Sequence, residues 1–173
     1  MQEIMARAAQ IRLVIFDVDG VLTDGSLYFG DDGLEYKAFN AKDGLGMKML
    51  QNSGVEVAII TARKSHVVAL RMESLGIKHF YQGRQQKLPA FEELRDKLNL
   101  TNEQIAYVGD DIVDLSVMTR VGLAVAVGDA HTRVQQQAHW QTRLPGGRGA
   151  AREVCDLLME SQGTLESAIE QYL

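Results

Sequence analysis

The sequence predicts an α/β fold in which a mostly parallel sheet is covered by helices on both faces. Short apolar runs alternate with helical patterns along the chain, and no repeat or low-complexity segment interrupts them. The 173 residues, 46% of them hydrophobic, are enough to fill one core. We therefore expect one domain over residues 1–173, with any ligand site at the carboxyl ends of the strands.

The expected elements follow in chain order. The strands are apolar runs at residues 11–16, 55–60, 77–81, 105–108 and 122–127. The helices lie at about 43–53, 64–75, 87–98, 111–120 and 150–161. Gly54 and Gly76 stand where glycine commonly ends a helix, and TNEQ at 101–104 matches a capping box.

Composition excludes several classes of protein. No apolar run is long enough to span a membrane, and the first ten residues lack the apolar segment of a secretory signal, so we expect a cytoplasmic protein. The single Cys155 cannot form an internal disulfide. A net charge of −5 argues against nucleic acid as a partner. An anionic substrate must therefore meet a local cluster of positive charge or a metal ion.

The first strand ends in two carboxylates, Asp17 and Asp19, in the stretch DVDGVLTDG. Alternate residues of a strand point to the same side, so the two acids repel each other unless a cation lies between them. Mg²⁺ prefers one or two carboxylates plus phosphate oxygens, and it would leave one carboxylate free to attack phosphorus. A single Asp-x-Asp motif is more often part of a solvated turn. The residues at the other strand ends must therefore show whether this motif belongs to a functional site.

Three further strands end in residues suited to phosphoryl chemistry. Thr61 follows the second strand, where its hydroxyl and the amides of an expected helix start could hold a phosphoryl oxygen, and Lys87 opens the helix after the third. The fourth strand runs into Asp110, Asp111 and, one turn later, Asp114. Each residue alone is commonly a helix cap, a surface charge or a dipole partner. Their order at four successive strand ends points to phosphoryl transfer.

This ordered set resembles the haloacid dehalogenase superfamily of aspartyl-phosphate phosphatases, and the resemblance covers the whole chain. It implies a Rossmann-like three-layer sandwich in which Asp17 is the nucleophile and Asp19 the general acid and base. Thr61 and Lys87 would hold and neutralise the phosphoryl group.

The same resemblance implies how a metal ion is held. Mg²⁺ would be bound by the Asp17 carboxylate, the Asp19 backbone carbonyl and Asp110. Asp111 and Asp114 would orient this metal site without ligating the ion.

The chain has no room for a cap domain over the site. Only 41 residues separate Asp19 from Thr61, and 25 separate Thr61 from Lys87. The first interval holds an expected β-hairpin at about 26–39, whose apolar residues are Leu27, Phe29, Leu34 and Tyr36. A hairpin too short to bury both faces suggests an assembly surface, although a solvent-exposed flap is the alternative.

In finer detail the chain is similar to the uncapped, tetrameric phosphatases of 3-deoxy-D-manno-octulosonate 8-phosphate, which act in lipopolysaccharide biosynthesis. The matching segments are DVDGVLTDG, FNAKDGLGMK (39–48), TARKSHVVALRMESLGI (61–77), YQG…K (81–87), AYVGDDIVD (106–114) and GGRGAAREVCDLL (146–158). The resemblance implies a homotetramer and a set of substrate contacts. Those contacts are Asp19, Asn40, Ala41, Lys42, Asp43, Gly44, Lys48, Arg63, Arg71 and Lys87. One departure is Ala62, where the family commonly has Gly.

Other functions remain open at this stage. The enzyme could act on another nonulosonate or sugar-acid phosphate, or the chain could be a catalytically silent relative that serves as a regulatory binding module. A receiver domain is disfavoured, because the third strand ends in YQG without an Asp. The open site is expected to receive its lid from a neighbouring subunit, through the hairpin and a flexible Gly-rich tail at 145–153. That tail is otherwise an ordinary surface loop.

Overall fold

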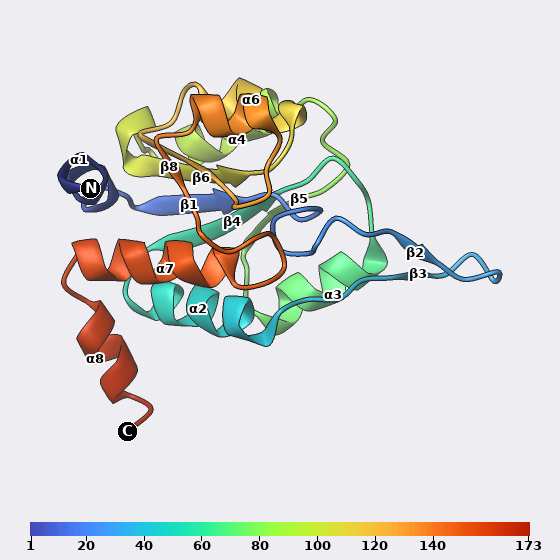
Figure 1. The fold of residues 1–173 in the computed structure, drawn as a ribbon, viewed down its shortest axis with the longest axis horizontal. Coiled ribbons are helices and arrows are strands. Elements are labelled where there is room, and N and C mark those ends of the chain that lie inside the picture. Colours follow the sequence, from blue (N-terminus) through green and yellow to red (C-terminus); the bar gives the residue numbers. More distant parts are fainter.

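The computed structural model describes residues 1–173 as a six-stranded parallel sheet between two layers of helices (Figure 1). The strand order is β5-β4-β1-β6-β7-β8, and every neighbouring pair is parallel. The strands are β1 (Leu13–Phe16), β4 (Glu56–Ile60), β5 (His79–Tyr81), β6 (Ile105–Gly109), β7 (Leu123–Ala126) and β8 (Trp140–Gln141). The predicted α/β fold is confirmed.

Helices cover both faces of the sheet (Figure 1). One layer contains α2 (Ala41–Asn52), α3 (His66–Ser74) and α7 (Ala150–Ser161), and the other contains α4 (Lys87–Lys97), α5 (Leu115–Met118) and α6 (Thr132–Gln137). Helices α1 (Gln2–Ala8) and α8 (Leu165–Glu170) lie near the two ends of the chain. None of the helices has the length and apolar character needed to cross a lipid bilayer.

All five expected strands are present, each trimmed by no more than two residues at either end or, in β6, extended by one. The helix expected at 111–120 is instead a 3₁₀ turn, Ile112–Asp114, followed by the four-residue helix α5. The capping box at Thr101 and Gln104 forms, but it begins only one 3₁₀ turn, Asn102–Gln104. Four short elements were not expected from the sequence: α1, α6, β8 and α8.

The central strands hold the site rigidly. All four residues of β1 and all five of β6 are buried, as expected for parallel strands with helices on both faces. The β1–β6 ladder continues beyond the strand, because the backbone N–H of Asp17 donates to the carbonyl of Val108 at 3.1 Å. The position of the first carboxylate is therefore fixed by the core and not by a loose loop.

The hairpin expected at 26–39 is formed by β2 (Tyr28–Phe29) and β3 (Glu35–Tyr36), which pair antiparallel. It projects away from the body of the molecule (Figure 1). The side chains of Phe29 and Tyr36 are 63% and 57% exposed, and Leu27 and Leu34 are also exposed. The hairpin therefore presents a row of apolar side chains that the chain does not cover itself.

The Gly-rich tail, which was expected to be flexible, is held by contacts within its own chain. The N–H of Gly147 donates to the carbonyl of Val21 at 2.9 Å, and a Cβ atom on Gly146 would collide with the carbonyl of Gly20. Arg148 forms an ion pair with Asp24 at 3.2 Å. Residues 146–148 are therefore packed against the loop that follows β1 of their own chain, and α7 begins directly afterwards.

Candidate active site

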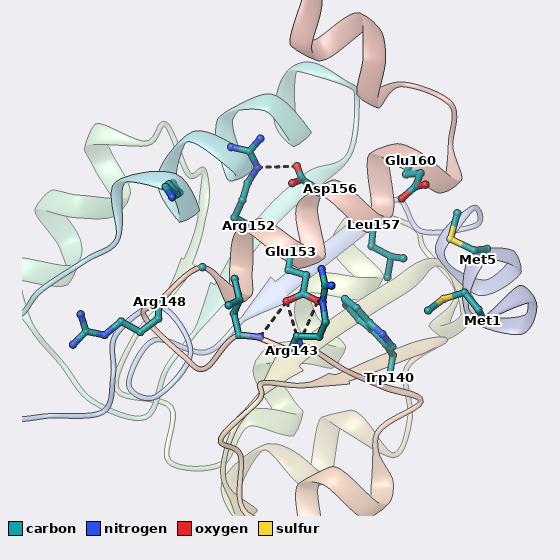
Figure 2. Close-up of a pocket in the computed structure, with 13 residues that line it drawn as sticks. Met1, Met5, Trp140, Arg143, Arg148, Arg152, Glu153, Asp156, Leu157 and Glu160 are labelled. Atoms are coloured by element: carbon teal, nitrogen blue, oxygen red, sulfur yellow. Dashed lines mark hydrogen bonds and ion pairs between the residues drawn. The ribbon is translucent and has the colours of Figure 1, made fainter.

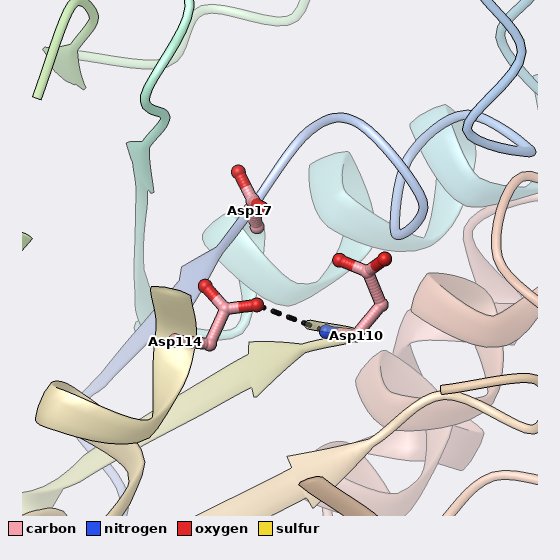
Figure 3. Close-up of side chains that lie close together, drawn as sticks. All are labelled: Asp17, Asp110 and Asp114. Carbon is pink, nitrogen blue, oxygen red and sulfur yellow. Dashed lines mark hydrogen bonds between the residues drawn. The ribbon is translucent and has the colours of Figure 1, made fainter. Parts of the chain in front are cut away.

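Four neighbouring strands bring the predicted catalytic residues to one edge of the sheet. Asp17, Thr61 and Asp110 directly follow β1, β4 and β6, which lie side by side, and Lys87 is the first residue of α4 after β5. Figure 3 shows how the side chains of Asp17, Asp110 and Asp114 lie near one another. One carboxylate oxygen from each lies within 4.8 Å of the others. The expected convergence at the carboxyl edge is therefore present.

Lys87 provides the one ammonium group in contact with this acidic cluster, and its side chain is fully buried. Its Nζ donates to Asp17 Oδ2 at 2.8 Å, Asp114 Oδ1 at 2.7 Å and the Tyr107 hydroxyl at 3.1 Å. Burial alone would lower the pKa of Lys87, but the Asp17 and Asp114 carboxylates outweigh it and raise the pKa. The side chain therefore stays charged in the core.

Asp114 organises the floor of the site. Besides Lys87, its carboxylate accepts hydrogen bonds from the Tyr107 hydroxyl at 2.6 Å and from the backbone N–H of Asp110 and Asp111 at 3.0 and 3.2 Å. Four donors occupy its lone pairs, so this carboxylate is suited to orienting its neighbours. The Asp111 side chain lies outside the cluster, where it is exposed and caps the 3₁₀ turn through the N–H of Ile112.

The donor set fits a divalent cation. Three carboxylates face one ammonium, and Asp110 Oδ1 is buried without any hydrogen-bond partner. Burial and the charges of Asp114 and Asp17 raise the pKa of Asp110 to about 8. Burial and Asp114 likewise raise the pKa of Asp17 to about 6, although Lys87 opposes the shift. A bound cation would supply the charge that these oxygens lack.

These pKa shifts predict how pH affects metal binding. A carboxyl group with a raised pKa stabilises the folded chain fully below pH about 4, and this contribution is lost as the pH rises toward about 8. Because Mg²⁺ requires the ionised form, the increase in Tm caused by Mg²⁺ should be larger at pH 8 than at pH 5.5. In Asp110→Asn this increase should nearly vanish, while the exposed control Asp96→Asn should retain it. Thermal melts with and without Mg²⁺ test this, and equal shifts in wild type and Asp110→Asn would contradict it.

Asp19 lies outside this acidic cluster and meets a second set of charges. Its carboxylate forms ion pairs with Lys37 and, at 3.8 Å, with Arg63. Both cations also contact Glu35, which belongs to the hairpin. Lys37 and Glu35 were not expected to approach the site. Glu35 belongs to β3 and Lys37 directly follows it, so their alternate spacing in extended chain places both on the same side, but only the tertiary fold shows that this side faces Asp19.

The phosphoryl-binding segment after β4 differs in detail from the expectation. Thr61 is buried, and its hydroxyl makes no hydrogen bond within the chain, so it is free to bind a ligand. The helix expected from residue 64 begins at His66, so the amides of Ala62 and Arg63 belong to a turn and not to a helix start. Ala62 does not have a positive φ, since Asn99 is the one non-Gly residue that does. Alanine is therefore compatible with the backbone there.

Most of the other expected substrate contacts lie on α2 or cap it. Asn40 and Ala41 start α2, where the Asn40 side chain caps the helix through the N–H of Lys42 at 2.8 Å. Lys48 is exposed on the same helix. Asn40 also lines a crevice together with Leu22, which belongs to the loop after β1.

A second group lines a narrow crevice between α2 and α3. A Cβ atom on Gly44 would collide with the Arg71 guanidinium, and Arg71 Nε is buried without a partner. Asp43 is buried and accepts from the N–H of Arg152 at 2.8 Å, at the start of α7, while its Oδ2 has no partner. Burial raises the pKa of Asp43 despite this hydrogen bond. Asp43 therefore links α2 to α7.

A hollow of about 820 Å³ lies elsewhere (Figure 2). Residues at the N-terminus, in α7 and in the loop before α7 line it, together with Lys42 and Trp140 of β8, and none of them belongs to the acidic cluster. Its arginines are already paired with acids, Arg143 with Glu153 at 3.2 Å and Arg152 with Asp156 at 2.7 Å. This hollow therefore has little free positive charge for an anionic substrate.

Comparison with known proteins agrees with the geometry. Residues 80–152 match the haloacid dehalogenase-like hydrolase family. The chain is 54% identical over 166 residues to 3-deoxy-D-manno-octulosonate 8-phosphate phosphatase of Escherichia coli, covering 96% of this chain and 88% of that protein.

Solved structures give the same result. The fold superposes with a TM-score of 0.94 on the phosphatase of the same name from Yersinia pestis, at 51% identity over 95% of this chain and 89% of the other. It superposes with a TM-score of 0.98 on the Moraxella catarrhalis enzyme in complex with magnesium, phosphate and a KDO molecule, at 38% identity over 100% and 99% of the two chains. The chain therefore belongs to the 3-deoxy-D-manno-octulosonate 8-phosphate phosphatases, within the haloacid dehalogenase-like hydrolases.

Proposed function

We propose that this protein hydrolyses 3-deoxy-D-manno-octulosonate 8-phosphate to the free sugar acid and phosphate, as a step of lipopolysaccharide biosynthesis. The observation that carries the proposal is the buried ammonium of Lys87 against Asp17 and Asp114, beside an unpartnered Asp110 oxygen. This arrangement combines a carboxylate nucleophile with positive charge for a phosphate ester. It occurs in a chain 54% identical to an enzyme of that name.

In the proposed mechanism, one Asp17 oxygen attacks phosphorus while the sugar oxygen leaves, which gives an aspartyl-phosphate. Asp19 donates a proton to the leaving oxygen and then takes one from the water that hydrolyses the intermediate. Lys87 neutralises charge on the phosphoryl group, and Thr61 offers a hydroxyl donor to it. The Asp17 and Asp110 carboxylates and the Asp19 carbonyl would hold Mg²⁺, which would supply further positive charge.

We also propose that the active unit is a homotetramer assembled through the hairpin. In support, a single chain leaves the hairpin's apolar residues exposed. A neighbouring subunit could bury them and cover the site. A single domain over residues 1–173 fits one core cluster of 46 buried residues. A cytoplasmic location stays a prediction.

Charge placed on the hairpin should therefore break the assembly. Phe29→Asp and Leu27→Asp are expected to convert the oligomer to monomers, measured by light scattering after size exclusion. Both variants should also turn over the sugar-acid phosphate more slowly. Turnover of p-nitrophenyl phosphate, a small substrate, should be affected much less. Leu70→Asp, at an exposed leucine on α3, is the control. A monomeric wild-type protein with full activity would contradict the proposal.

Phosphate release across a panel of phosphorylated sugar acids, with and without EDTA, tests the function itself. We expect preference for 3-deoxy-D-manno-octulosonate 8-phosphate and loss of activity in EDTA. If the enzyme prefers another sugar-acid phosphate, the proposed substrate is wrong and the proposed mechanism still holds. No turnover of any phosphate ester would favour the silent binding module.

A further inference from the structure

The base of the hairpin carries a lysine whose burial is unusual for its position. Lys37 immediately follows β3, next to the exposed Tyr36, yet its own side chain is fully buried. Its ammonium forms ion pairs with Asp19 Oδ1 and with Glu35 Oε1, the latter at 3.3 Å. Burying an ammonium is costly unless it is paired, so a specific partner must hold it there. One of its two partners, Asp19, is the residue proposed as the general acid and base.

Arg63 closes these contacts into a ring. Its Nη2 lies 2.9 Å from Glu35 Oε1, and its Nε lies 3.8 Å from Asp19 Oδ2. Its guanidinium also lies over the Phe29 ring, 6.0 Å from the centroid. Each oxygen of Asp19 thus has a different cation near it, although Arg63 Nε makes no hydrogen bond. The ring joins three segments: the loop after β1, the hairpin, and the turn after β4.

The ring joins the hairpin directly to the catalytic loop. The strands β2 and β3 are only two residues long, and their large apolar side chains are exposed, so packing within one chain constrains the hairpin weakly. A general acid must keep its carboxyl group within hydrogen-bond reach of the leaving oxygen. The contact between Lys37 and Asp19 can therefore fix the orientation of this carboxyl group and make it depend on the hairpin.

We propose that Lys37 is a positioning residue that orients Asp19 for proton transfer, with Glu35 anchoring Lys37 to the hairpin. The inference rests on the proposed function and deepens it, because it assigns a catalytic consequence to the hairpin's own charges. A sugar alcohol is a poor leaving group and requires the proton from Asp19. p-Nitrophenol leaves readily without one. Loss of Lys37 should therefore affect the two classes of substrate differently.

The test compares kcat/KM for these two substrates in Lys37→Met, which keeps the length of the side chain and removes its charge. The value of kcat/KM for each substrate reports the steps up to departure of the leaving group. We expect at least about a tenfold loss for the sugar-acid phosphate, mainly in kcat, and a change of less than about threefold for p-nitrophenyl phosphate. Lys37→Arg should recover part of the loss. The control is Lys78→Met, at an exposed lysine before β5.

Glu35→Gln provides an independent check, since it removes the anchor and leaves Lys37 in place. It should give a smaller loss with the same dependence on the leaving group. Equal losses for both substrates, or a loss confined to KM, would overturn the proposal, because they would indicate a folding defect or direct substrate binding. Wild-type turnover of the sugar-acid phosphate tests the proposed function separately. If another alkyl phosphate is the better substrate, the same comparison is made with it.

Discussion

Asp17→Asn is expected to abolish phosphate release, with kcat reduced on the order of 10⁴-fold or more. The amide cannot form the covalent intermediate, although it can still accept the hydrogen bonds that Lys87 and the N–H of Val18 now donate to Asp17. Steady-state phosphate release measures the loss. Mass spectrometry of acid-quenched enzyme should show a phosphoryl adduct in the wild type and none in the variant.

The same substitution should leave stability nearly unchanged, which separates loss of chemistry from loss of fold. Burial and Asp114 raise the pKa of Asp17 to about 6, so a neutral side chain relieves repulsion while it loses the ion pair with Lys87. We expect the Tm to stay within a few degrees of wild type. Substantial Mg²⁺-dependent turnover by Asp17→Asn would show that the nucleophile is a different group.

Lys87→Met should reduce both activity and stability. The phosphoryl group would lose the ammonium proposed to neutralise it, and removal of one donor from a preorganised anion site typically costs 10²–10³-fold in kcat. Asp17 and Asp114 would be left buried without their shared ammonium, and breaking a buried pair typically costs about 3–5 kcal/mol. For a domain of this size, 3 kcal/mol corresponds to a decrease in Tm of about 6–12 °C.

The pH dependence of the loss of stability in Lys87→Met identifies the cause of that loss. Because the pKa of Asp17 is already raised to about 6, its carboxyl group can take up a proton in the variant, and the loss of stability should be smaller at pH 6 than at pH 8. Lys97→Met, at the exposed end of the same helix, is the matched control. A Tm unchanged at pH 8 would mean that the buried carboxylates need no cation from Lys87.

The sequence by itself determined the parallel α/β fold and the residues at its functional edge. Apolar runs too short for helices define β1, β4 and β6, and their alternation with helices dictates parallel pairing. In a parallel sheet every carboxyl end lies at one edge, so Asp17, Thr61 and Asp110 had to converge. Short elements such as α6 and β8 lack a detectable period because they bury too few side chains.

The tertiary structure decided which side chains actually touch. Nothing in local periodicity places Lys37 beside Asp19, or Gly146 against the loop after β1, because these contacts join segments distant in the sequence. The same holds for the Tyr107 hydroxyl, which lies between Lys87 and Asp114. From the sequence, a tyrosine in a buried strand is expected to be an ordinary core residue. The sequence pattern around a residue determines its local conformation and the face of the helix or strand on which it lies. Its partners depend on how all the elements pack together, which no single segment specifies.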